Sequence, residues 1–220
     1  MLHRDVSPNN LMWAPGGSGG MRVRQSRDAK QQTRPSEDIG YLVDLDFAAI
    51  VENEVGTVEQ IGIDDLPHTL ALPFLAIDHL PPDILMVPQS SPPPTTAGRH
   101  IYRHDLESFF WSVWWILLKM VRDRDGSSSI DEILAGWQSH NLGKNRASKR
   151  GFLLYYAEWS VVVSQSLWPQ HERVTMMESF LNNMSTIFIN GYIALEEGSD
   201  YPTAGGHITF KNLLQVFPQE

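Results

Sequence analysis

The segment from Tyr102 to Val121 constrains the fold of this chain most strongly, because it is apolar on nearly every helical face. Its large apolar residues are Leu106, Phe109, Phe110, Trp111, Val113, Trp114, Trp115, Ile116, Leu117, Leu118 and Met120. A helix without a polar face must be buried on every side. The uncharged run from Ser108 to Leu118 is too short to cross a bilayer, which takes about 20 apolar residues. We therefore expect the central helix of a globular, mainly helical body.

The composition fits one globular domain, with 42% hydrophobic and 20% charged residues in 220. A net charge of -9 argues against a nucleic-acid partner, because binding to phosphates requires a basic face. The lack of cysteine excludes disulfides, zinc–thiolate sites and a cysteine nucleophile. The first residues do not read as a secretory signal. We expect an intracellular protein, in cytoplasm or nucleus, without a nucleic-acid or membrane partner.

The first ten residues contain a pair of side chains suited to phosphoryl transfer, Asp5 and Asn10. An aspartate held in a turn can accept the proton of an attacking hydroxyl group, and an asparagine five residues later can turn its carbonyl oxygen toward a magnesium ion. The alternative is an ordinary polar turn, because Asp, Ser, Pro and Asn are common turn residues.

A second candidate metal ligand, Asp44, follows the apolar run Tyr41–Leu42–Val43 and is followed by Asp46. Two neighbouring carboxylates suit a hard divalent cation, which prefers oxygen ligands. A half-buried strand that ends in a polar turn would give the same pattern.

Four segments in this order resemble the fungal-type protein kinase family, a divergent branch of the protein-kinase fold. They are residues 3–10 (HRDVSPNN), 42–48 (LVDLDFA), 72–77 (LPFLAI) and 104–111 (HDLESFFW). The resemblance covers about residues 2–122 with specific motifs. It implies an α+β, mainly α fold: a protein-kinase-like C-terminal lobe over residues 1–220, with a short β-hairpin of Leu11–Trp13 and Tyr41–Val43 at the catalytic loop.

The resemblance also implies roles for individual residues. Asp5 would be the catalytic base, with His3 and Arg4 beside it in the catalytic loop and Arg4 sensing the activation segment. Asn10 and Asp44 would be the ligands of Mg²⁺ and so bind the ATP phosphates, ATP and Mg²⁺ being the cofactors of the complete domain. The buried acid that braces the loop from the central helix would be Asp105.

Several positions depart from the kinase pattern. Ser7 stands where Ser/Thr kinases carry a lysine that meets the transferring phosphate, and Ala71 replaces a threonine that would bond the catalytic aspartate. Asp78 replaces the glutamate that ends the activation segment, a residue that pairs with an arginine; Arg173 is a candidate partner. These departures leave the specificity for the accepting hydroxyl open.

No Gly-rich loop, ATP-binding lysine or partner glutamate precedes Asp5 in this sequence. We therefore expect a lobe whose N-lobe is missing and whose turnover alone is negligible, since charged clamps contribute several powers of ten to phosphoryl transfer. The surface that would face an N-lobe should expose apolar side chains, and such a surface is suited to a protein substrate or partner.

Three functions fit these observations. The main hypothesis is a fungal-type protein kinase domain fragment, whose parent enzyme moves the γ-phosphoryl group of ATP to protein Ser/Thr hydroxyls. The second is a small-molecule phosphotransferase of the aminoglycoside or choline kinase type. The third is a non-catalytic, pseudokinase-like binding module.

The remaining segments predict loops and packing helices. We expect a flexible insertion at 14–39, rich in Gly, Ser, Arg and Gln, and a Pro/Ser/Thr-rich loop at 88–100. The expected helices are Ile130–Gln138, Ala147–Leu167, His171–Gly191 and Thr209–Phe217, the last with Thr209 as N-cap.

The two histidines ahead of the central helix raise the question of a zinc motif. His100 and His104 are four residues apart, but Ile101 replaces the glutamate of a His-Glu-x-x-His zinc helix. We therefore expect them to be surface histidines without a metal.

Overall fold

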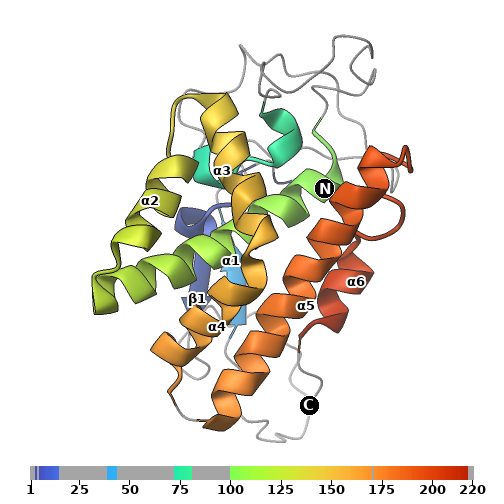
Figure 1. Ribbon diagram of the computed structural model, residues 1–220. Helices are drawn as coiled ribbons and strands as arrows, with labels where there is room; N and C mark the ends of the chain where they lie inside the picture. The colour runs from blue at the N-terminus through green and yellow to red at the C-terminus, as the bar shows by residue number, and fades with distance from the viewer. Residues whose placement is uncertain are drawn as a thin grey trace, which may run out of the picture.

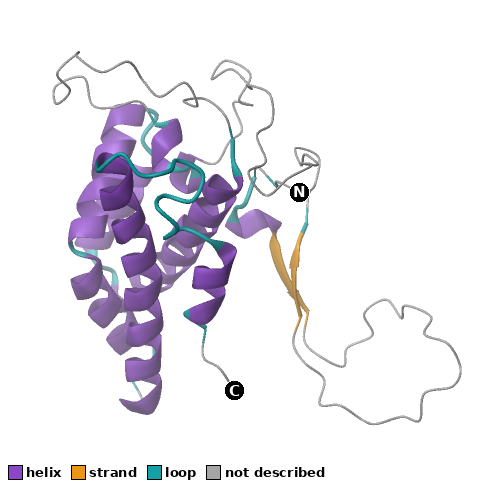
Figure 2. Ribbon diagram, turned by 90° about the vertical axis from the view of Figure 1, so that its right-hand side faces the viewer, coloured by secondary structure: helices purple, strands orange, loops and turns teal. Residues whose placement is uncertain are grey.

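The structure, a computed structural model, describes residues 3, 5–14, 39–43, 72–80, 100–169 and 171–217. These residues form a helical body with a two-stranded ribbon to one side of it (Figures 1 and 2). The helices are α1 Tyr102–Asp125, α2 Ser128–Trp137, α3 Leu142–Leu154, α4 Tyr156–Leu167, α5 His171–Glu196 and α6 Phe210–Gln215. The mainly helical class with a short hairpin is as predicted. In the described part of the chain, no helix is both long and apolar enough to cross a membrane.

Helix α1 lies at the centre of the core, as its sequence predicts. Phe110, Trp111 and Trp114 are fully buried. The ring of Trp111 meets Trp137 of α2 edge-on at 5.0 Å, and that of Trp114 meets Phe152 of α3 at 4.9 Å. Edge-to-face pairs of this kind add about 1 kcal/mol each to the burial of their area. These aromatic contacts therefore join α2 and α3 to α1.

The expected burial of α1 on every side is wrong near its C-terminal end. Ile116 is 37% exposed and Met120 is 48% exposed. The helix also continues past the predicted Val121, to Asp125. It ends where Gly126 adopts a left-handed conformation (φ 66°) and its N–H bonds the carbonyl of Arg122 at 2.8 Å. Glycine is favoured at such a C-terminal position because it has no Cβ.

The predicted single helix over 147–167 is two helices, α3 and α4. They meet at Tyr155 (φ −118°, ψ 18°), which ends the first helix and begins the second. Helix α3 begins earlier than predicted because the side chain of Asn141 accepts the N–H of Lys144 at 3.0 Å and so caps it. The break turns the chain so that α4 packs along α5.

The other expected elements are present with small changes. Strands β1 (Leu11–Ala14) and β2 (Ile39–Leu42) pair antiparallel, with Leu11 opposite Leu42. Thr209 is the N-cap of α6, its Oγ1 accepting the N–H of Asn212 at 3.2 Å. Residues 15–38 of the predicted insertion and 88–99 of the predicted Pro/Ser/Thr-rich loop lie outside the described residues.

Candidate active site

Asp5 and Asn10 lie together in the structure, as the motif predicts. The chain between them ends in a short 3₁₀-helix, η1 (Pro8–Asn10), in which the N–H of Asn10 bonds the carbonyl of Ser7 at 3.0 Å. The Nδ2 of Asn10 donates to the backbone carbonyl of Asp5 and to its Oδ2, each at 2.9 Å. Two acceptors on one side fix which end of the Asn10 amide faces Asp5. Its Oδ1 therefore points elsewhere and accepts no hydrogen bond from the described residues.

His3 joins this loop to the strand that precedes Asp44. Its Nδ1 accepts the N–H of Asp5 at 3.3 Å, which leaves the ring proton on Nε2. That Nε2 lies 3.0 Å from the carbonyl of Val43, to which it can donate. The N–H of Val43 in turn bonds the carbonyl of Asn10 at 2.9 Å. The end of β2 is thus held against the loop; Asp44 itself, like Arg4 and Ala71, lies outside the described residues.

Asp105 of α1 braces the loop that contains Asp5 and Asn10. Its Oδ2 accepts the backbone N–H of His3 at 2.7 Å, and its Oδ1 lies 2.8 Å from Nε2 of His100. About two turns further along α1, Ser112 donates to the carbonyl of Val6 at 3.4 Å. Two points on one buried helix therefore position the loop.

Asp78 pairs with Arg103; the side chain of Arg173, the candidate partner, lies outside the described residues. A terminal nitrogen of Arg103 lies 2.6 Å from Oδ2 of Asp78, and its Nε donates to the carbonyl of Tyr201 at 3.1 Å. Burial acts to lower the pKa of Arg103, but the carboxylates of Asp78 and Glu107 outweigh it and raise that pKa. The pair joins the end of the predicted activation segment to the first turn of α1. Its two residues are only 25 positions apart in the sequence.

Two buried charged side chains, those of Glu107 and Lys149, bond backbone atoms of residues 75–77 and were not predicted from the sequence. The Oε1 of Glu107 accepts the N–H of Ile77 at 2.5 Å and Nε1 of Trp111 at 3.1 Å. Burial raises the pKa of Glu107, and burial lowers the pKa of Lys149 to about 7 against the opposing effect of Glu107. Lys149 donates to the carbonyl of Leu75. The signal in the sequence was a lone glutamate inside the apolar run of α1.

His100 and His104 are not surface histidines, so that prediction is wrong. His104 is fully buried, and His100 is largely covered, with its Nε2 2.8 Å from Oδ1 of Asp105. Both rings pack against His79 of the short helix η4 (Ile77–His79), with ring centroids 5.3 Å and 4.1 Å apart. Spacing in the sequence could not reveal this cluster, because η4 comes from a separate segment.

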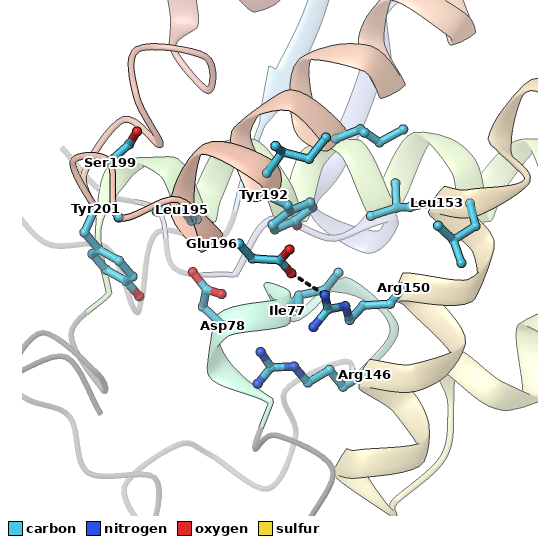
Figure 3. A pocket seen from close by; sticks show the side chains of 14 residues that line it. Ile77, Asp78, Arg146, Arg150, Leu153, Tyr192, Leu195, Glu196, Ser199 and Tyr201 are labelled. Atoms are coloured by element: carbon cyan, nitrogen blue, oxygen red, sulfur yellow. Dashed lines mark hydrogen bonds and ion pairs between the residues drawn. The ribbon is translucent and has the colours of Figure 1, made fainter. Parts of the chain in front are cut away.

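A pocket of about 540 Å³ lies between η4, α3 and α5 (Figure 3). Its polar lining includes Asp78, Arg146, Arg150 and Glu196, of which Arg150 and Glu196 form an ion pair. Arg146 donates to the carbonyl of Leu80 at 2.7 Å. This pocket adjoins the end of the predicted activation segment and includes none of the predicted catalytic residues.

The arrangement of Asp5, Asn10 and Asp105 is the one that the resemblance to protein kinases implies, and the class of the chain follows from the comparison with protein families. Residues 1–117 match the model of the family described as fungal protein kinase. Because this match covers more than half of the 220 residues, the chain belongs to the fungal protein kinase family. Comparisons with curated proteins and with solved structures returned no match.

Proposed function

We propose that the loop from His3 to Asn10 is the base-bearing and magnesium-binding part of an ATP-dependent protein kinase site. The observation that carries this proposal is the double hydrogen bond from Nδ2 of Asn10 to Asp5. It holds the carboxylate in place and turns the carbonyl oxygen of Asn10 away from it. Oxygen ligands of this kind are those that Mg²⁺ prefers.

In this proposal Asp5 accepts the proton of the attacking protein hydroxyl group, and Asn10 with Asp44 binds the metal. Bound Mg²⁺ would neutralise charge on the ATP phosphates. Asp105 acts through His3: by accepting its N–H at 2.7 Å it fixes the start of the loop and so the position of Asp5. Since Ser7 supplies no cation, the transferring phosphate must be stabilised by other groups.

We propose that a protein substrate or partner binds at the surface beside the loop. A depression of about 550 Å³ is lined by Pro8 and Asn9 of the loop and by Ile116 and Met120 of α1. The last two are the exposed apolar residues of that helix, and exposed apolar side chains at a site favour contact with a protein.

The proposal is tested by binding of Mn²⁺–ATP, because Mn²⁺ takes the oxygen ligands of Mg²⁺ and is paramagnetic. We expect the 220-residue chain to bind it saturably, detected by electron paramagnetic resonance of the free ion. Asn10→Ala should weaken binding at least about tenfold, since even outer-shell changes cost about 10- to 100-fold in metal affinity. Asn9→Ala, a change of the exposed neighbour, is the matched control and should bind as the wild type.

Asp5→Asn separates the two roles of the loop. It should leave Mn²⁺–ATP binding within about threefold of wild type, because in this proposal Asp5 accepts a proton and does not bind the metal. Lack of Mn²⁺–ATP binding by the wild-type chain, or equal binding by Asn10→Ala, would refute the magnesium site. In that case the non-catalytic module is favoured.

A further inference from the structure

We propose that the pocket between η4, α3 and α5 binds a fatty acid or a similar carboxylate with an apolar body, its head group against Arg146 (Figure 3). The volume of about 540 Å³ lies in the range of pockets that enclose most of a drug-sized molecule. The pocket includes no residue of the loop from His3 to Asn10, so this ligand site is separate from the proposed kinase site.

Much of the wall of the pocket is apolar. It is formed by Ile77 of η4, by Leu153 and Leu154 of α3, and by Ile189 and Ile193 of α5. Leu154 is 79% exposed and Ile193 is 49% exposed, so part of this wall is in contact with water. Transfer of a hydrocarbon chain from water onto such side chains is favourable. The wall therefore suits the apolar part of an amphipathic ligand.

The charged side chains of the lining leave one positive charge without a partner. The pocket is lined by Asp78, Arg146, Arg150 and Glu196. Arg150 is paired with Glu196, and Asp78 is paired with the buried Arg103 at 2.6 Å. Arg146 forms no ion pair with any residue that the structure describes. An anion with a single charge is therefore the ligand that balances this lining.

Arg146 has donors to offer a carboxylate while it keeps its present contact. One of its terminal nitrogens donates to the carbonyl of Leu80 at 2.7 Å. A guanidinium group has five N–H donors in a planar fork, which matches the two oxygens of a carboxylate. Burial is the main cause that lowers the pKa of Arg146, and Arg150 adds to this effect while Asp78 opposes it. An anion beside Arg146 would offset the hydration that burial removes.

Other head groups fit this lining less well. A cationic head group would add a second positive charge beside Arg146, and like charges placed together are costly. A doubly charged phosphate would exceed the one unpaired positive charge, and its second charge would meet the carboxylates of Asp78 and Glu196. An uncharged head group would leave Arg146 without a partner. The carboxylate is thus favoured over each of these.

A ligand in this pocket would join the short helix η4 to α3 and α5. Two backbone hydrogen bonds hold η4, from the N–H of His79 to the carbonyl of Ala76 and from the N–H of Leu80 to that of Ile77, each at 3.0 Å. A ligand that binds only the folded arrangement stabilises it. Amide exchange of these two N–H groups should therefore slow when the pocket is filled.

The experiment titrates decanoate into the 220-residue chain by calorimetry, with decanol as the probe of the same chain length and an uncharged head group. We expect one equivalent of decanoate to bind at least about tenfold more tightly than decanol, because bonds between charged groups are strong. In Arg146→Met this ratio should fall below about threefold while decanol still binds, since methionine keeps a long apolar side chain. Lys144→Met removes an exposed cation of the same helix outside the pocket and should keep the wild-type ratio.

A second pair of variants tests the apolar wall. Ile193→Gln should weaken decanoate and decanol alike, by at least about threefold, because it replaces apolar surface. Val162→Gln changes a similarly exposed apolar residue outside the pocket and should weaken neither.

Several results would overturn the carboxylate site. They are equal affinity of the wild type for decanoate and decanol, no saturable binding of decanoate, and an unchanged ratio in Arg146→Met. Displacement of decanoate by Mn²⁺–ATP would also overturn it, because the ligand would then lie at the nucleotide site. Amide exchange at His79 and Leu80 that decanoate leaves unchanged would refute the joining of η4 to the two helices.

Discussion

Replacement of Lys149 by methionine tests whether burial lowers the pKa of this lysine. Lys149 is fully buried in α3, with its Nζ on the carbonyl of Leu75 and 4.9 Å from the centre of the Trp111 ring. Burial lowers its pKa from 10.5 to about 7. Methionine keeps a long flexible side chain without the charge, so Lys149→Met removes the titration while largely preserving packing.

The sign and size of the effect follow from proton linkage. The folded pKa lies below the unfolded one, so between pH 7 and 10.5 the unfolded chain binds more protons and the free energy of unfolding rises with pH. One pKa unit corresponds to about 1.4 kcal/mol. Because Lys149 is half protonated near pH 7, its contribution should rise by about 2 kcal/mol from pH 7 to 9. That rise should be absent in Lys149→Met.

The assay is urea unfolding at pH 7, 8 and 9, followed by tryptophan fluorescence and by circular dichroism. We expect the difference in unfolding free energy between wild type and Lys149→Met to change by about 2 kcal/mol across this range. Lys144→Met alters an exposed lysine of the same helix and should keep the wild-type pH dependence. Parallel curves for wild type and Lys149→Met would show that Lys149 keeps its ordinary pKa and would refute the reasoning.

Two further predictions concern packing and charge. A Cβ at Gly136 would lie 2.2 Å from Oγ and 2.8 Å from Cβ of Ser148, so Gly136→Ala should lower the free energy of unfolding by about 1–3 kcal/mol in urea titrations. Gly151 has open space around it, and Gly151→Ala should instead stabilise helix α3 by up to about 1 kcal/mol. Arg103→Met leaves the carboxylate of Asp78 without its partner and should cost about 3–5 kcal/mol, measured in the same way.

Each of these predictions has a contradicting result. Equal stability of Gly136→Ala and Gly151→Ala would show that α2 and α3 are not in close contact. A loss below about 1 kcal/mol in Arg103→Met would indicate that water screens the pair with Asp78 as at an exposed surface.

The parts of the fold that could be predicted are those with local signals. The apolar run of α1 identified the central helix, and Thr209 correctly marked the start of α6. The break between α3 and α4 has no such signal, because Tyr155 is neither glycine nor proline. Tertiary packing of α4 along α5 determines that break, and a single sequence carries no direct record of it.

The candidate site also has one part that the sequence predicts and another that it does not. Asp5 and Asn10 are five residues apart, so a local motif was enough to pair them. The partner of Asp78 and the third histidine of the cluster depend on segments that meet only in the folded chain. The prediction of surface histidines considered only residues 100–104, whereas His79, which packs against them, lies on another segment.

Four residues in the first two turns of α1 each contact a different segment of the chain or a different atom of it. Arg103 pairs with Asp78 at the end of the predicted activation segment, and His104 packs against His79 of η4. Asp105 accepts the N–H of His3 in the predicted catalytic loop, and Glu107 accepts the N–H of Ile77. Successive residues of a helix differ by about 100° in direction. A deletion or insertion of one residue at this point would therefore rotate every partner out of reach at once. This stretch should tolerate conservative substitutions far better than any change of length, and a rotation of α1 would move both loops together.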